Sequence, residues 1–420
     1  MTQHFDLILR QGNLLDGPEH AVDLAIQDGV IAAIAPHLDA IAAQDLDISG
    51  CLISPPFVES HIHLDSALTA GDPRWNESGT LFEGIEIWAE RKRNLSLEDV
   101  KRRALEALKL QASHGVLFVR THADVSEPSL TPLKALLEVR DRVKDWMTVQ
   151  VVAFPQDGMY GHAQNEALLE EALRLGADVV GGIPHYELTR EDGVRSVHRI
   201  FELAEQYERP IDIHCDETDD PQSRFLEVVA ACALRRNLGP RVTASHTTAF
   251  ASYDNAYAFK LMGLLRRSQI NLIANPLINL TLQGRGDTYP KRRGITRVKE
   301  LWQQGLNVSL GHDCIQDPWY NLGNGNPLDV AHLAIHACQM TGREEIRACY
   351  DMVTDRGLHT LGLPATKLVE GDAATLIVLA APNVFEVIRN RSPVRLSVVR
   401  GRVVLARSPA LVRWSANFLT

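Results

Sequence analysis

Short apolar runs alternate with helical patterns through the middle of the chain, and this alternation restricts the fold more than any other feature. The segments between the runs have the apolar spacing of amphipathic helices. Eight candidate strands lie near residues 52–58, 116–122, 148–154, 178–183, 211–215, 241–246, 270–274 and 307–311. Repeated strand–helix units give a parallel sheet with right-handed crossovers. Eight such units favour a closed (β/α)₈ barrel of the TIM type, with its active site at the carboxyl ends of the strands.

The two ends of the chain have a different texture from the middle. Residues 5–34 alternate apolar and polar positions between turn glycines, which is typical of short antiparallel strands. The same alternation returns at 374–404. We therefore expect the two ends to combine into one small β-sandwich. The predicted organisation is 1–54 for its first part, 55–365 for the barrel and 366–420 for its second part.

Composition restricts the partners and the compartment. The 420 residues carry a formal net charge of −10, which argues against nucleic acid and anionic membranes as partners. The sequence has no apolar run of the length, about 18 residues, that a transmembrane helix needs. The first residues lack the basic and apolar regions of a signal peptide. Six cysteines without a CxxC pair fit a reduced setting, so we expect a cytoplasmic protein.

Metal-binding residue types recur where the predicted strands end. His61 and His63 are two positions apart at the end of the first barrel strand, so their side chains project from the same face. His214, His246 and Asp313 end three other strands. A lone HxH or a lone histidine is weak evidence, because core histidines are common. Four strands that deliver such residues to one end of a barrel predict a metal-dependent hydrolase.

The predicted metal ligands are His61, His63, His214 and Asp313, with a water in the open position. Imidazole and carboxylate together suit Zn²⁺ or Fe²⁺. Such an ion can lower the pKa of its water to about 7, and His246 would then orient or deprotonate that water. Two-metal barrel hydrolases use a carboxylated lysine, but the sequence has none between Lys144 and Lys260. We therefore expect one divalent metal per chain.

Glu217 follows His214 by three positions and is the candidate acid–base group. A carboxyl beside the metal can take a proton from water and pass it to the substrate. An equally good interpretation is a solvated loop acid, because Glu217 lies in the acidic run 216–220. His122 and His185 also end strands and are candidates to line the mouth of the site.

With these residues in place, the chain closely resembles the bacterial-type cytosine deaminases of the amidohydrolase superfamily. The resemblance spans nearly the whole chain, and its combination of motifs is specific. The matching stretches are Pro55-Pro56-Phe57-Val58-Glu59, His61-Ile62-His63-Leu64-Asp65, Ser78-Gly79-Thr80-Leu81-Phe82-Glu83-Gly84-Ile85, Val152-Ala153-Phe154-Pro155-Gln156, His214-Cys215-Asp216-Glu217, Ala244-Ser245-His246-Thr247-Thr248, Asp287-Thr288-Tyr289-Pro290-Lys291-Arg292-Arg293-Gly294 and Asp317-Pro318-Trp319-Tyr320.

The resemblance implies roles for residues around a nucleobase. Gln156 holds the O2 and N3 edge of the ring, the carbonyl of Leu81 accepts from N1–H, and Trp319 forms a wall beside the ring. Glu217 protonates N3 as hydroxide attacks C4, and His246 holds the hydroxide. Asp313 can take the second proton of that hydroxide. By the same resemblance the protein is a homo-oligomer, with a hexamer as the expected form.

The chain departs from this family at Cys314, where the family pattern has a second aspartate next to the metal-binding one. In the family this residue lies near C5 and the exocyclic amine of the ring. A thiol tolerates apolar contact, whereas a carboxylate resists losing its hydration to a methyl group. We therefore expect deamination of 5-methylcytosine to thymine, and of cytosine to uracil, with release of ammonia.

Several alternatives stay open at this level. If Cys314 is a neutral variant, the protein is a plain cytosine deaminase that does not favour 5-methylcytosine. Another cyclic amidine such as isoguanine is a further candidate substrate. Ring-amide hydrolysis of the dihydroorotase kind is disfavoured by the missing lysine. A non-catalytic scaffold barrel is disfavoured because every predicted metal ligand is retained.

Overall fold

The computed structural model describes residues 4–410. The chain divides into two compact units, one formed by Phe57–Ala365 and one by Met1–Pro56 together with Thr366–Thr420. Residues 1–3 and 411–420 of the predicted end segments lie outside the described residues. In the part described, no helix is both long and apolar enough to cross a bilayer.

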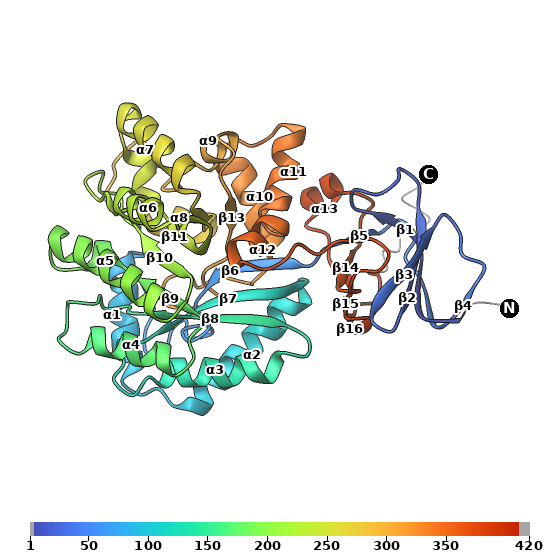
Figure 1. Ribbon diagram of the computed structural model, residues 1–420, viewed down its shortest axis with the longest axis horizontal. Helices are drawn as coiled ribbons and strands as arrows, with labels where there is room; N and C mark the ends of the chain where they lie inside the picture. The colour runs from blue at the N-terminus through green and yellow to red at the C-terminus, as the bar shows by residue number, and fades with distance from the viewer. Residues whose placement is uncertain (1–3, 411–420) are drawn as a thin grey trace, which may run out of the picture. The chain divides into compact units, whose positions relative to one another are not determined.

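The larger unit is the predicted barrel (Figure 1). Eight strands pair in the order β13-β12-β11-β10-β9-β8-β7-β6, and every pair is parallel. The strands are β6 (Phe57–Ile62), β7 (Val116–Asp124), β8 (Thr148–Phe154), β9 (Val179–Gly182), β10 (Ile211–Cys215), β11 (Val242–His246), β12 (Asn271–Ala274) and β13 (Val308–Leu310). The (β/α)₈ prediction is therefore confirmed.

The first and last barrel strands meet at residues of the predicted metal site. The amide of Asp313 donates to the carbonyl of His61 at 2.9 Å, and the amide of His63 donates to the carbonyl of Asp313 at 3.1 Å. A parallel bridge joins Ile62 to Asp313 at the same place. We call this closure, formed by His61, Ile62, His63 and Asp313, the seam of the barrel.

The run predicted as one strand at 52–58 is in fact two strands, β5 (Leu52–Ser54) and β6. Pro55 and Pro56 separate them, because proline has no N–H and cannot continue a hydrogen-bonded ladder. At this break the chain leaves the sheet of the end unit and enters the barrel, so the boundary between the two units falls between Pro56 and Phe57.

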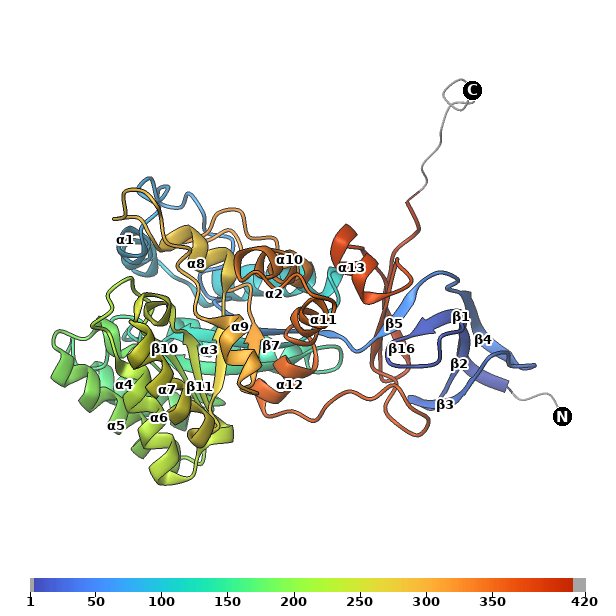
Figure 2. The same ribbon diagram turned by 90° about the horizontal axis from the view of Figure 1, so that it is seen from above.

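Helices cover the outside of the barrel. Figures 1 and 2 show α5, α6 and α7 side by side on the outer side of strands β9 to β11. The helices of this unit are α1 (Leu81–Lys92), α2 (Leu97–Ser113), α3 (Thr131–Val143), α4 (Asn165–Arg174), α5 (Arg190–Gln206), α6 (Phe225–Arg236), α7 (Asn255–Ser268), α8 (Pro276–Leu282), α9 (Val298–Gln303), α10 (Pro327–Ala337), α11 (Arg343–Asp351) and α12 (Asp355–Leu361). Side-chain caps fix several starts. Thr80, for example, accepts from the amide of Glu83 before α1.

The two ends of the chain combine in the smaller unit, as predicted. Its strands are β1 (His4–Leu14), β2 (Val22–Gln27), β3 (Val30–Ala35), β4 (Ile41–Asp47), β5, β14 (Leu376–Leu379), β15 (Val394–Val399) and β16 (Arg402–Ala406), with one helix, α13 (Val384–Asn390). The hydrogen-bonded path runs β16-β15-β14-β5-β1-β2-β3, and β4 pairs with β1. Strand β5 joins the two ends, because it pairs with β1 on one side and with β14 on the other.

Candidate functional site

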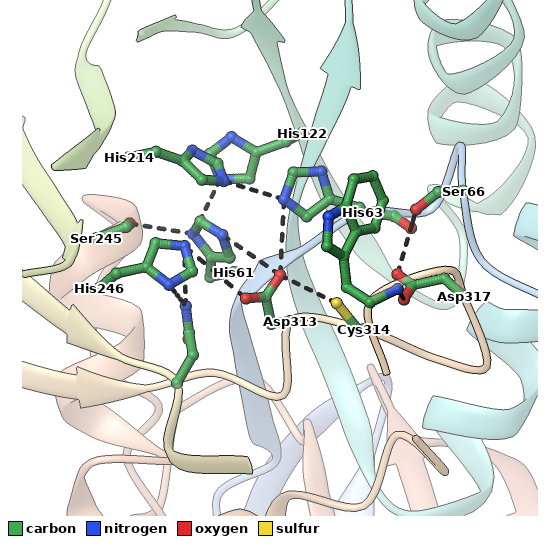
Figure 3. A network of polar contacts seen from close by, with 12 residues as sticks. His61, His63, Ser66, His122, His214, Ser245, His246, Asp313, Cys314 and Asp317 are labelled. Atoms are coloured by element: carbon green, nitrogen blue, oxygen red, sulfur yellow. Dashed lines mark hydrogen bonds and ion pairs between the residues drawn. The ribbon is translucent and has the colours of Figure 1, made fainter. Parts of the chain in front are cut away.

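The predicted metal residues converge at the carboxyl ends of the barrel strands (Figure 3). His61 lies on β6 and His63 directly after it, His214 lies on β10, and Asp313 follows β13. Figure 3 shows the imidazoles of His61, His63 and His214 grouped above the carboxylate of Asp313. All four side chains are buried.

The distances between these side chains fit a shared cation. Ligand atoms of His61, His63 and His214 lie within 4.8 Å of one another. Nε2 of His63 is 3.1 Å from Nε2 of His214, and Oδ1 of Asp313 is 3.6 Å from Nε2 of His63. Nε2 of His61 is buried and has no hydrogen-bond partner among residues 4–410. Nitrogen lone pairs and a carboxylate aimed at one point are the donor set expected for a divalent metal ion.

Burial keeps these histidines in the form that binds metal. Desolvation lowers the pKa of His63 to about 4. The pKa values of His61 and His214 are lowered well below the usual range, first by burial and then by the neighbouring imidazoles. The imidazoles are therefore neutral at pH 7, and a neutral imidazole has the lone pair that a metal requires.

A strained backbone directs two of the site residues inward. His246 and Asp313 have φ angles of 67° and 71°. Such left-handed conformations cost free energy in residues other than glycine, and they cluster at functional sites. Here they turn the chain where a strand ends, so that each side chain faces the centre of the barrel mouth.

Glu217 lies inside the site and is not a solvated loop acid. Its side chain is buried, and Oε1 lies 3.2 Å from Nδ1 of His246. Burial raises the pKa of this carboxyl to about 8. The preceding residue, Asp216, explains the inward turn, because its carboxylate accepts from the amides of Phe225 and Leu226 and so ties the loop to the start of α6.

The predicted substrate residues line one pocket beside the metal cluster. The pocket walls are His63, Leu81, Gln156, Ile183, His214, Glu217, His246, Ile278, Leu282, Asp313, Cys314 and Trp319. One contact differs from the expectation. The Leu81 carbonyl, predicted to face the ring N1–H, accepts from Nε1 of Trp319 at 3.2 Å. Leu81 is also the first residue of α1, so its carbonyl accepts the helical bond from the amide four residues on, and both lone pairs of the oxygen are in use.

Cys314 occupies an apolar corner of this pocket. It packs in a cluster with Ile85, Trp88, Ile278, Leu282 and Trp319. Its Sγ lies 3.6 Å from Oδ1 of Asp313. Burial raises the pKa of the thiol well above its usual range, and the carboxyl groups of Asp313 and Asp317 raise it further. The residue therefore presents a neutral, polarisable surface to the pocket.

A network of polar side chains lies below the metal cluster, and the sequence analysis did not predict it. Oγ of Ser245 lies 3.0 Å from Nδ1 of His61 and donates to Asp212 at 2.7 Å. Asp212 in turn pairs with Arg120 at 3.0 Å. His122, predicted at the mouth, lies in this layer, with its Nε2 at 3.1 Å from Nδ1 of His61. These contacts fix the ring of His61 from behind.

The spacing of residues along two strands could have revealed this polar network. Arg120 lies two positions before His122 on β7, and Asp212 lies two positions before His214 on β10. Residues two apart on a strand share a face. Each charged residue therefore belongs to the layer directly beneath its histidine, inside the barrel.

Comparison with known proteins places the chain in a family. The amidohydrolase family model matches residues 44–405. The crystal structure of a 5-methylcytosine deaminase from Klebsiella pneumoniae, liganded with 5-fluorocytosine, is 47% identical, with a TM-score of 0.94 over 97% of this chain and 99% of that one. An N-isopropylammelide isopropyl amidohydrolase from Pseudomonas sp. (strain ADP) is 27% identical over 98% of this chain and all of its own length. A pterin deaminase from Rhizobium rhizogenes is 28% identical over 91% of this chain and 87% of its own length. The chain is a member of the amidohydrolase family.

Proposed function

We propose that the protein hydrolyses the C4 amine of a cytosine ring, converting 5-methylcytosine to thymine and cytosine to uracil with release of ammonia. The metal-type cluster, the adjacent carboxyl of Glu217 and the pocket containing Gln156 support a deaminase of this kind. The similarity to the Klebsiella pneumoniae 5-methylcytosine deaminase supports the same choice of substrate.

The observation that carries the proposal is the position of Cys314. Its thiol lies in an apolar cluster and lines the same pocket as Gln156 and Glu217. A methyl group at C5 of the ring would meet sulfur and hydrocarbon there. The aspartate of the related cytosine deaminases would instead require a carboxylate to lose its hydration against the methyl group.

Four residues would hold one divalent ion, Zn²⁺ or Fe²⁺: His61, His63, His214 and Asp313. When bound, the ion supplies a water whose pKa is lowered to about 7. Side chains of the protein would bind and orient the base. Gln156 has a donor and an acceptor on one amide, which suits the O2 and N3 edge of the base. Trp319 would form a wall beside the ring, and the Leu81 carbonyl would accept from N1–H in place of its bond from Trp319.

Glu217 would move the proton. Its carboxyl lies beside His246 at the wall of the pocket, so it can take a proton from the attacking water and deliver it to N3. The C4–O bond then forms without leaving a negative charge on the ring. His246 orients the attacking oxygen, and Asp313 accepts its second proton. Asp313 then passes that proton to the C4 amine, so that cleavage of the C4–N bond releases ammonia and leaves the C4 carbonyl.

We further propose that the protein works in the cytoplasm as a homo-oligomer, with a hexamer as the expected form. The resemblance to bacterial-type cytosine deaminases supports this assembly. Light scattering on the purified protein gives its mass directly, and a mass near 46.6 kDa, that of one chain, would contradict it.

The test of the substrate compares 5-methylcytosine, cytosine, isoguanine and creatinine by ammonia release. We expect the parent to use 5-methylcytosine at least as well as cytosine. In Cys314→Asp, the ratio of kcat/KM for the two bases should move toward cytosine by about tenfold or more, since one methyl group is discriminated by roughly 10–200-fold.

Cys314→Ser is the matched control, because it keeps the size and neutrality of the side chain. It should preserve most of the parent's preference. If the parent rejects 5-methylcytosine but deaminates cytosine, plain cytosine deamination is the better assignment. If only isoguanine releases ammonia, the ring edge read by Gln156 belongs to another cyclic amidine.

A further inference from the structure

His246 has polar neighbours at both ring nitrogens, and they differ in kind. Nε2 lies 3.8 Å from Oδ2 of Asp313, on the side of the metal cluster. Nδ1 lies on the opposite side, at 3.0 Å from Nδ2 of Asn279 and 3.2 Å from Oε1 of Glu217. Which nitrogen carries the proton decides whether His246 can donate to the attacking oxygen or accept from it.

The backbone fixes the orientation of the Asn279 amide. Oδ1 of Asn279 accepts from the amide N–H of Asn275 at 3.2 Å. A backbone N–H can only donate, so the atom facing it must be the oxygen. The other end of the side chain, which faces His246, is therefore the NH₂ group. Asn279 is fully buried in the middle of α8, and its own N–H donates to the Asn275 carbonyl, so the side chain is held in place.

An amide NH₂ group has no lone pair available and can only donate. Nδ1 of His246 must therefore be the acceptor, which leaves the ring proton on Nε2. The Glu217 carboxyl does not decide the question, because a carboxyl can pair with either form of Nδ1. The Nδ2 atom of Asn275 also lies near the ring, at 3.3 Å from Nδ1 and 3.5 Å from Nε2, but its Oδ1 has no hydrogen-bond partner among the described residues, so the orientation of this amide is not fixed and does not decide the tautomer.

From this geometry we infer that Asn279 is a positioning residue that holds His246 as the Nε2–H tautomer. This inference rests on the proposed function for its catalytic meaning. With the proton on Nε2, His246 donates toward the oxygen that attacks C4 and has no lone pair there to remove a proton from it. Of the two roles predicted for His246, orienting is retained, and the first proton of the attacking water goes to Glu217.

The first test needs no substrate. ¹⁵N NMR of zinc-loaded protein with labelled histidine distinguishes a ring nitrogen that carries a proton from one that does not. The signals of His246 are identified by their loss in His246→Gln. We expect Nδ1 to be unprotonated and Nε2 to be protonated at neutral pH. A protonated Nδ1 in the parent would overturn the inference, whatever the substrate of the protein.

The second test reverses the tautomer. Asn279→Asp keeps the shape and the bond to the Asn275 amide but presents an acceptor to Nδ1, so the proton should move from Nε2 to Nδ1. Loss of one donor to the developing oxyanion typically costs about 10²–10³ in kcat. We expect a loss of that size, with KM within about threefold and metal content unchanged. An Asn279→Asp variant with parental kcat would contradict the inference.

Two variants separate positioning from loss of structure. Asn279→Ala removes the donor without adding charge, so it should release the bias on the tautomer and cost less than Asn279→Asp. Asn271→Asp places a carboxylate at the opposite end of β12, where the native amide is also buried, and should leave kcat of the folded protein unchanged. If the parent releases ammonia from none of the bases while Nδ1 is unprotonated, the proposed function fails and the tautomer assignment stands.

Discussion

The chemistry of the Glu217 carboxyl depends on the contacts that hold its loop against the barrel. Burial raises its pKa to about 8, and His246 lies beside it at 3.2 Å. A carboxyl with a pKa near neutrality can both take and give a proton during one turnover, whereas an ordinary surface glutamate cannot do so efficiently.

Glu217→Gln should therefore reduce kcat by about 10²–10⁴, because the amide keeps the size of the side chain but cannot shuttle a proton. Metal content should be unchanged, since Glu217 is not among the proposed ligands. The measurement is steady-state deamination together with metal analysis. Asp220→Asn is the matched control in the same loop, because its side chain accepts from the Gln222 amide and is not among the residues that line the pocket. Turnover by Glu217→Gln within a few-fold of the parent would remove Glu217 as the proton carrier.

For single residues, the sequence predicted which side chains belong to the site better than it predicted what surrounds each of them. His61 and His63 could be placed together because the alternation of a strand fixes the face of both side chains. The inward position of Glu217 could not be predicted, because it depends on Asp216 capping a helix nine residues further on. The bond from Trp319 to the Leu81 carbonyl joins residues 238 positions apart, and no local pattern encodes such a contact.

Among the elements, α1 matters most for the pocket, because it carries Leu81 at its start and is anchored at its end. Nζ of Lys92 lies 3.1 Å from Asp124 at the end of β7 and 2.6 Å from Asp157. Asp157 is adjacent to Gln156, which lines the pocket. Lys92 thus links the helix to the loop that presents Gln156.

Lys92→Met should lower the stability of the protein and raise KM more than it lowers kcat. Removing one partner of a buried ion pair leaves uncompensated charge and typically costs about 3–5 kcal/mol. Asp124 is buried and Asp157 largely so, and without the lysine the two carboxylates repel each other. Thermal unfolding and steady-state kinetics measure the two effects.

Lys101→Met on α2 is the matched control for that change. Lys101 also bridges two acids, but Glu98 and Glu138 are 82% and 55% exposed. Exposed pairs contribute about 0–1 kcal/mol, so this variant should resemble the parent. Equal effects of the two substitutions would show that Lys92 has no special link to the pocket.

Strands and helices were predicted well where the apolar periodicity is strong. They were predicted less well where a single residue determines the end of an element. The barrel strands β7 to β13 lie close to the predicted positions, because buried apolar runs between amphipathic helices are distinctive, whereas β6 lies later than the predicted 52–58. The break between β5 and β6 was missed, although Pro55 and Pro56 signal it, since the apolar run continues through both prolines.

For the whole molecule, the central prediction concerns the metal. Purified protein should contain about one Zn²⁺ or Fe²⁺ per chain, and His63→Ala should lose both metal and activity. The substitution removes one of the four proposed ligands, so the remaining three should hold the ion more weakly and in a distorted position. Metal analysis gives the stoichiometry, and His37→Ala, a change at a largely exposed histidine of the end unit, is the control. Two bridged metals per chain would contradict the argument from the missing lysine.

The seam of the barrel has a consequence for how the protein is made. His61 and Asp313 are separated by about 250 residues, and at about 5–20 residues per second the ribosome needs roughly 10–50 s to cover that distance. Until Asp313 is added, the nascent chain carries two and later, after His214, three of the proposed ligands, but it lacks both the carboxylate and the strand that closes the ring. Ribosome-bound chains that stop before β13 should therefore retain little zinc after a chelator wash, whereas released full-length chains should retain it. Metal loading in this protein would then be an event after translation, and the completed barrel would be its precondition.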